Sequence, residues 1–168
     1  MPDRRQHRGA HPQDTRLFAE SFVKALRAAV GDMQYLLSRG YAERSALSLV
    51  GNRYRLQERQ RKALQRVVCS EPQFVRRKAK ELPATSLRGK EVIIDGLNQL
   101  ISLECALSGG YLFAGLDGCL RDIAGLHGTY KRVLETDVAI RLIGETLQQL
   151  EVTQVHWLLD QPVSNSGR

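Results

Sequence analysis

The stretch Lys90-Glu91-Val92-Ile93-Ile94-Asp95-Gly96-Leu97-Asn98-Gln99-Leu100 joins an apolar run to an abrupt polar end. Three β-branched residues followed by Asp95 and Gly96 predict a short strand that ends at a turn. Because the apolar run is continuous, we expect this strand to be covered on both faces. Asp95 would then lie at the carboxyl tip of the strand, where Gly96 allows the chain to turn sharply.

A second strand with the same ending is predicted at residues 155–160, which finish in Asp160. Two helical patterns separate the strands, so the connection is long enough for a crossover and the strands should be parallel. Asp95 and Asp160 would then share the carboxyl edge of one sheet, where open α/β folds place their sites. We expect Trp157, inside the second strand, to belong to the core.

Composition limits the class of protein. The 168 residues suffice for the core of one domain or two small ones. The three cysteines form no CxxC pair, which favours buried thiols in a reducing compartment. No apolar run approaches membrane-spanning length and no hydrophobic signal core follows the N-terminus. We therefore expect a cytoplasmic protein that does not contact a membrane.

The net charge of +7 is unevenly distributed along the chain. Residues 1–90 hold 20 Lys and Arg against 8 Asp and Glu, whereas residues 91–168 hold 5 against 10. This division predicts a first half that attracts polyanions and a second half that is rich in carboxylates.

The first half is predicted to be helical. Residues 1–15 are polar and basic, and we expect them to form a disordered tail. Apolar spacing predicts helices at about 16–40, 43–54 and 56–68, so that residues 16–82 form an all-helical basic domain. Charged and turn-prone residues, at 76–80 and 83–86, would link it to an α/β domain at 88–168.

A basic stripe runs along the third predicted helix. Its members, with their neighbours, are Arg53, Arg55, Arg59, Arg61, Lys62 and Arg66. Helices joined by short turns, the last of them basic, outline a helix-turn-helix module, so we expect these six side chains to contact nucleic acid. A helical cap or dimerisation unit with a solvated charged face would produce the same pattern.

Motifs in both halves resemble two known families. Residues 39–41, 45–54 and 59–61 closely resemble the family catalogued as domain of unknown function 434. Residues 94–98, 117–125 and 159–168 resemble its companion, domain of unknown function 5616. The resemblance extends over about residues 30–168 and implies no established activity.

Asp95-Gly96-Leu97-Asn98, directly after an apolar strand, is also similar to the opening of PIN-like and NYN-type nucleases. That resemblance implies a three-layer α/β fold in which a first-strand aspartate and later carboxylates bind Mg²⁺ or Mn²⁺ for phosphodiester hydrolysis. Asp95 matches that aspartate and Asn98 the polar residue beside it, whereas Leu97 stands where most relatives have an aromatic residue.

The predicted catalytic residues are Asp95, Asp160 and Asn98, with the two aspartates as metal ligands. Hard divalent cations need converging oxygen ligands, and strand ends hold carboxylates rigidly. Weaker candidates are Glu104, Asp117 and Asp122. The alternative for Asp95 is a turn aspartate that caps the following helix.

Two later segments carry further predictions, one about a glycine-rich loop and one about a helix cap. The glycine-punctuated residues 108–130 form either a substrate-facing loop that carries Arg121 and His127 or a loop packed between helices. Thr136 is predicted to cap a helix that extends to about Leu150.

Related chains continue through at least one more strand, so the resemblance implies a shortened, incomplete α/β domain. Its exposed sheet edge would favour self-association. We therefore expect a metal-dependent nuclease-like protein or its truncated remnant, inactive in this chain. The alternative is a non-catalytic nucleic-acid-binding or regulatory protein that uses the basic helical domain.

Overall fold

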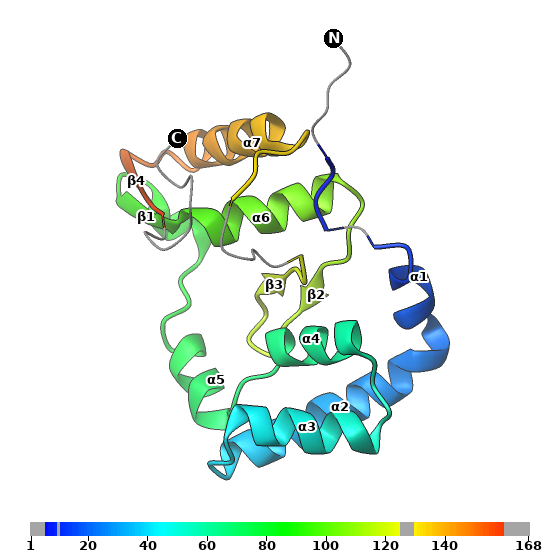
Figure 1. Ribbon diagram of the computed structural model, residues 1–168. Helices are drawn as coiled ribbons and strands as arrows, with labels where there is room; N and C mark the ends of the chain where they lie inside the picture. Colours follow the sequence, from blue (N-terminus) through cyan, green and yellow to red (C-terminus); the bar gives the residue numbers. More distant parts are fainter. Residues whose placement is uncertain (1–5, 10, 125–129, 160–168) are drawn as a thin grey trace. The chain divides into compact units, whose positions relative to one another are not determined.

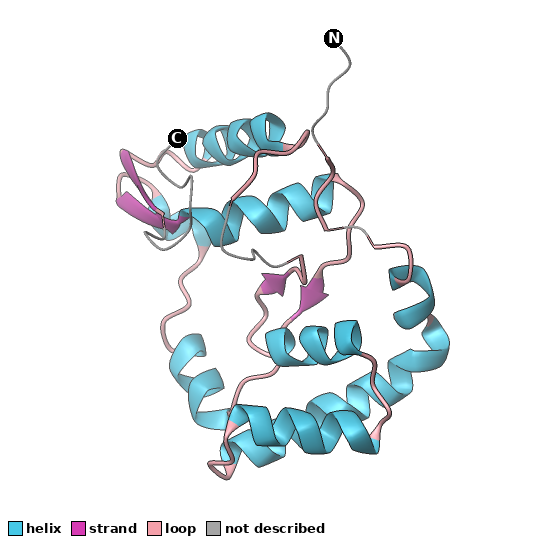
Figure 2. Cartoon of the chain, in the orientation of Figure 1, coloured by secondary structure: helices cyan, strands magenta, loops and turns pink. Residues whose placement is uncertain are grey.

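The computed structural model describes residues 6–9, 11–124 and 130–159 of the chain. Helices and short strands divide into two compact units (Figures 1 and 2). The helical unit comprises residues 11–81 and 111–123, and the α/β unit comprises residues 1–10, 82–110 and 124–168. None of the described helices is long and apolar enough to cross a membrane.

The helical unit begins with five helices. They are α1 (Asp14–Leu17), α2 (Glu20–Ser38), α3 (Glu43–Arg53), α4 (Glu58–Val67) and α5 (Glu71–Lys78). The three helices predicted from apolar spacing correspond to α2, α3 and α4. The predicted linker at 76–80 is wrong in part, because α5 continues to Lys78; Ser70 and Gln73 form a capping box that starts this helix.

The core of this unit lies where α2, α3 and α4 meet. Each helix contributes a fully buried side chain, namely Met33, Val50 and Leu64. An antiparallel pair, β2 (Phe113–Ala114) and β3 (Leu120–Arg121), joins the same unit. The unit therefore differs from the continuous domain at 16–82 that we expected, because residues 111–123 complete it from a later part of the sequence.

The α/β unit is built from two strands and two long helices. They are β1 (Glu91–Asp95), α6 (Gly96–Leu107), α7 (Thr136–Gln149) and β4 (Gln154–Leu158), and the 3₁₀ helix η1 (Ala84–Leu87) precedes them. β1 and β4 are parallel, with Asp95 opposite Leu158. Helices α6 and α7 pack together (Figure 1). The predicted α/β class and the parallel strand pair are confirmed.

The strands are less buried than their apolar runs predict. Ile93 is 67% exposed and Trp157 is 36% exposed. In β1 only the alternate residues Val92 and Ile94 are half-buried, which is the pattern of a strand packed on one face. The predictions of a strand covered on both faces and of a core tryptophan are therefore wrong, because the described sheet has only two strands.

The cysteines follow the sequence prediction only in part. Cys69 and Cys105 have buried thiols that form no disulfide, as expected, but the thiol of Cys119 is exposed.

Candidate functional site

Asp95 lies at the carboxyl end of β1, as predicted, and its side chain is exposed. It occupies the N-cap position of α6, yet its carboxylate accepts no hydrogen bond from the backbone amides of the first turn of this helix. Instead, Asn98 Nδ2 donates a hydrogen bond to Asp95 Oδ2 at 2.7 Å. The alternative of a capping aspartate is not supported, and an exposed carboxylate–amide pair remains at the edge of the strand.

The carboxyl end of β4 reaches the same edge. A Cβ at Gly96 would lie 2.8 Å from Leu159 Cδ2 and 3.1 Å from the Leu158 carbonyl oxygen, so any larger residue would require the end of β4 to shift. Asp160 follows in the sequence but lies outside the described residues, and its convergence with Asp95 stays a prediction. Within the part of the chain that the structure describes, no three His, Cys, Asp or Glu side chains are grouped to hold a metal ion.

Two of the six predicted nucleic-acid-binding cations, Arg59 and Arg61, are held within the fold by hydrogen bonds of 2.8 Å or less. Arg59 donates to both oxygens of the buried Asp14, at 2.5 and 2.7 Å. Arg61 donates to the Leu56 carbonyl and to Asn52 Oδ1, each at 2.8 Å. These two guanidinium groups stabilise the helical unit, and helical spacing alone did not distinguish them from the others.

The other four cations leave more of their charge at the surface. Arg53 and Arg55 lie at the end of α3 and are exposed; Arg53 has an ion pair with Asp32 at 3.4 Å. Lys62 and Arg66 lie one turn apart on α4. Burial first, and then the neighbouring arginine charges, lower the pKa of Lys62 below its ordinary value.

The net positive charge of the chain belongs entirely to the helical unit. Its residues include 16 Lys and Arg against 9 Asp and Glu, whereas the α/β unit has 9 of each. The excess positive charge is therefore concentrated in a unit that contains residues 111–123 as well as residues 11–81, and the attraction for polyanions stays a prediction.

An apolar pocket of about 300 Å³ lies within the helical unit. Three aromatic rings line it: the Phe18 centroid is 4.7 Å from that of Phe113 and 5.5 Å from that of Tyr111. Arg27 also lines the pocket. Sequence reasoning missed this feature because two of the rings come from residues beyond the predicted helical domain.

Asp117, a weaker metal candidate, is used in ion pairs instead. Its side chain is 1% exposed and accepts hydrogen bonds from Arg121 at 2.6 and 2.7 Å and from Arg77 at 2.6 Å. The hydrogen bonds from Arg121, followed by those from the Cys119 amide and Arg77, hold the pKa of Asp117 well below its usual range. Arg121 is thus a structural partner, and His127, the other residue of the proposed substrate-facing loop, lies outside the described residues.

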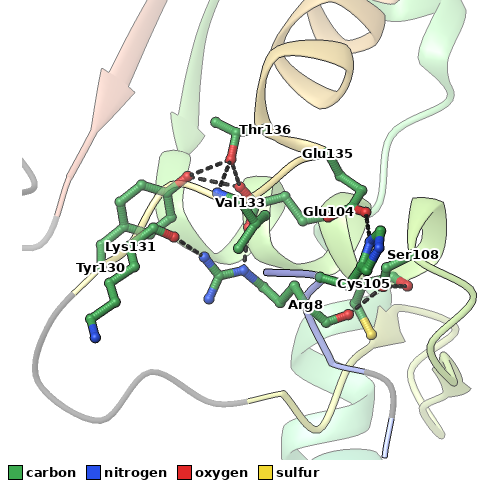
Figure 3. Close-up of polar contacts among 10 residues, drawn as sticks. Arg8, Glu104, Cys105, Ser108, Tyr130, Lys131, Val133, Glu135 and Thr136 are labelled. Carbon is green, nitrogen blue, oxygen red and sulfur yellow. Dashed lines mark hydrogen bonds and ion pairs between the residues drawn. The ribbon is translucent and has the colours of Figure 1, made fainter. Parts of the chain in front are cut away.

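Glu104 is the centre of a buried polar network in the α/β unit (Figure 3). Its carboxylate is fully buried, and Oε1 accepts hydrogen bonds from Tyr130 at 2.7 Å and Thr136 at 2.6 Å. Burial raises the pKa of Tyr130 to about 12. We predicted that Thr136 caps α7, and this is wrong by one residue. Glu135 occupies the N-cap position, and Thr136 is the first residue of the helix.

The cation that balances Glu104 is Arg8, from the segment predicted to be a disordered tail. The Arg8 Nε donates to Glu104 Oε2, and Nη2 donates to the Lys131 carbonyl oxygen at 2.5 Å (Figure 3). Its guanidinium lies 5.2 Å from the centroid of the Tyr130 ring, and the Ser108 hydroxyl donates to the Arg8 carbonyl. Sequence reasoning could not find this site, because residue 8 carries no periodic signal.

His7 and Glu135 extend the same network. His7 Nδ1 lies 2.5 Å from Glu135 Oε1. The second oxygen of Glu135 is buried and has no hydrogen-bond partner among the described residues. Residues 6–9 therefore make defined polar contacts with residues more than one hundred positions later.

Comparison with known proteins places the chain in a family. Residues 84–168 match the family described as "Domain of unknown function (DUF5616)", and residues 25–80 match "Protein of unknown function (DUF434)". The chain belongs to this DUF5616 family, with a DUF434 region ahead of the matching domain, as the motifs indicated.

A relative in Methanocaldococcus jannaschii bears the name "Uncharacterized protein MJ0935". It is 34% identical over 143 residues, which are 85% of this chain and 68% of that protein. No solved structure matches the chain.

Proposed function

We propose that this protein binds nucleic acid through its helical unit. The observation that carries the proposal is the location of the whole net charge of +7 in that unit. Arg55, Lys62 and Arg66 add surface charge on and beside α4 that the buried ion pairs do not use. Lysines and arginines that neutralise phosphates release condensed counterions, so binding should depend little on sequence and strongly on salt.

The aromatic pocket supports a preference for single strands. Proteins that bind single-stranded nucleic acid combine a basic surface with aromatic rings on which bases stack. Phe18, Tyr111 and Phe113 provide half-buried rings in the same unit as the excess positive charge. We expect an unpaired base to bind more tightly than a base held in a duplex.

Fluorescence anisotropy of labelled oligonucleotides between ~50 and ~200 mM salt tests this function. The logarithm of the affinity should fall linearly with the logarithm of the salt concentration. Replacing Arg55, Lys62 and Arg66 together by alanine should reduce that slope, by about 0.7 for each phosphate of a single strand that is no longer neutralised. Affinity that does not depend on salt would refute nucleic-acid binding.

A matched control removes the same charge elsewhere in the helical unit. It replaces three exposed cations that lie outside the α4 surface: Arg16, Lys24 and Lys80. The control should keep most of the wild-type slope. An equal reduction in both triple variants would show that only the net charge matters and that the α4 surface has no special role.

A second proposed function concerns the carboxyl edge of the β1–β4 pair, which we propose acts as the divalent-ion site of a nuclease-like protein. The observation that favours it is Asp95, exposed at a strand end beside Asn98. Mg²⁺ accepts one or two protein carboxylates and keeps several waters, so Asp95 together with Asp160 fits its needs. A bound ion of this kind neutralises charge that develops on phosphate oxygens.

Thermal unfolding with Mn²⁺ tests the ion site separately from nucleic-acid binding. A ligand that binds only the folded state raises the unfolding midpoint, and Asp95→Asn should abolish that rise. Glu145→Gln is the matched control, because it removes an exposed carboxylate from α7 of the same unit. No rise in the wild type, or an equal rise in Asp95→Asn, would refute the ion site without affecting the salt-dependence result.

Cleavage of a labelled single strand is the second measurement. Any hydrolysis that the chain catalyses should require Mg²⁺ or Mn²⁺ and should be absent in Asp95→Asn. Cleavage that survives this substitution would exclude Asp95 from the reaction and with it the nuclease-like assignment.

A further inference from the structure

The pocket that surrounds Arg8 has the features of a binding site for an arginine side chain. A fully buried carboxylate, a backbone carbonyl and the face of an aromatic ring converge on one guanidinium (Figure 3). These groups come from Glu104 in α6 and from residues 130 and 131. Only 11% of the Arg8 side chain is exposed, so the guanidinium is largely enclosed.

The geometry selects arginine over lysine. The Arg8 Nε reaches Glu104 while Nη2 reaches the Lys131 carbonyl, and Cζ lies over the Tyr130 ring. A lysine ammonium is a compact point charge without the fixed planar fork of donors that reaches the carboxylate and the carbonyl together. The pocket is therefore selective for the planar guanidinium group of arginine.

The pocket also restricts the residue after the arginine, Gly9. Gly9 has φ +85°, a conformation that favours glycine. A Cβ at Gly9 would lie 2.5 Å from Cys105 Sγ and 3.3 Å from Cys105 Cβ. Any side chain at this position would collide with α6, so the site selects an Arg-Gly pair.

Residues 6–9 contact the α/β unit as a peptide ligand would. They are joined through residue 10 to the helical unit, and the continuous part of the α/β unit begins only at Leu82. Gln6 and His7 are exposed, and the segment is held mainly by polar contacts to residues 104–135. Departure of this segment would leave the later elements of the unit covalently intact.

We propose that the α/β unit contains an Arg-Gly recognition site that its own Arg8 and Gly9 occupy, and that an Arg-Gly peptide of a second molecule can replace them. The site adds partner recognition to the protein and does not depend on nucleic-acid binding. The fully buried Glu104 carboxylate supplies the driving force, because an unpaired buried charge is strongly unfavourable.

Peptide binding to the full-length chain tests the proposal. The probe is a fluorescein-labelled peptide with the sequence of residues 6–9, Gln-His-Arg-Gly. The Arg8→Ala variant, whose site is vacated, should bind it saturably. The wild type should bind it at least tenfold more weakly, because the attached segment competes at an effective concentration of order millimolar.

Specificity and control variants sharpen this test. Peptides with lysine in place of arginine, or alanine in place of glycine, should bind Arg8→Ala at least tenfold more weakly. Adding Glu104→Gln to Arg8→Ala should abolish binding. Arg141→Ala, which removes an exposed arginine from α7, should bind the peptide like the wild type. Equal binding of the arginine and lysine peptides would overturn the proposal.

A stability measurement covers the case in which Arg8→Ala folds poorly. The Arg-Gly peptide should then restore the helical circular dichroism signal of Arg8→Ala and raise its thermal midpoint, and the Lys-Gly peptide should not. Rescue by neither peptide, or by both equally, would overturn the site. A wild-type dimer in light scattering that Arg8→Ala abolishes would identify a second copy as the peptide source, and a monomer would exclude a second copy.

Discussion

Substituting Asp117 by asparagine removes the negative charge on which two arginines of the helical unit converge. The carboxylate is 1% exposed and accepts two hydrogen bonds from Arg121 and one from Arg77. Asparagine has nearly the same shape, so the change leaves packing in place and removes the charge. The arginines would then lack the group that compensates them.

The magnitude follows from the exposure of the partners. Removing one partner of a buried ion pair costs about 3–5 kcal/mol when the remaining charge stays buried. Here Arg77 is 47% exposed and Arg121 is 24% exposed, so water can reach both guanidinium groups. We therefore expect a loss of about 2–3 kcal/mol, which lowers the midpoint of a unit of this size by roughly 10–20 °C.

Urea and thermal unfolding of the wild type and of Asp117→Asn measure the loss. Glu81→Gln is the control, because Glu81 pairs with Lys78 at the same distance, 2.6 Å, but is 61% exposed. It should cost less than about 1 kcal/mol. Similar losses in the two variants would refute the argument that burial determines the strength of the Asp117 pairs.

The same carboxylate makes stability depend on acid. Its pKa is lowered in the folded state, so its contribution is complete above the ordinary carboxyl pKa near ~4 and disappears as the pH falls below that value. The wild type should lose stability more steeply than Asp117→Asn in this acid range. Parallel curves for the two proteins would contradict the lowered pKa.

Three further predictions concern other buried contacts. Gly51→Ala should destabilise the helical unit by about 1–2 kcal/mol in urea unfolding, because the new Cβ would lie 2.5 Å from Arg61 Cζ. Gly31→Ala is the control: no atom lies within 4 Å of the new Cβ, so this change should stabilise the unit by about 0.5–1 kcal/mol. Tyr130, with its pKa raised to about 12, should ionise near that pH in an ultraviolet titration, and the stability that it contributes below pH ~10 should be lost as the pH rises from that value through about 12; a titration unchanged in Tyr130→Phe would contradict this. Gly96→Ala should cost about 1–3 kcal/mol and reduce amide protection in β1 and β4, and unaltered hydrogen exchange would argue against the close approach there.

The elements that sequence reasoning predicted correctly are those with a local periodic signal. Apolar spacing located α2, α3 and α4 within a few residues, and the β-branched run at 92–94 and the largely apolar run at 155–159 located β1 and β4. Strand direction followed from the length of the connection. Burial did not follow, because it depends on how many neighbouring strands and helices cover each face.

The candidate sites show the same division between local and distant information. Asp95 and Asn98 lie three residues apart, and the short sequence motif correctly identified them as neighbours at the strand end. The pairing of Arg59 with Asp14 spans 45 positions, and that of Arg8 with Glu104 spans 96. Spacing along one helix cannot show which of its arginines meets an acid from another element, so the sequence did not reveal that Arg59 pairs with Asp14.

The path of the chain between the two units affects how they can be made and inherited. Residues 111–123 return to the helical unit after β1 and α6 have been synthesised, and β4 comes last. During synthesis, therefore, Arg77 has no Asp117 to pair with, and the Val67 carbonyl has no Leu116 amide, until more than thirty further residues have been made. A genetic exchange at the junction near residue 82 would separate Arg77 and Val67 from the partners that residues 111–123 supply, although the buried core of α2, α3 and α4 would stay on one side.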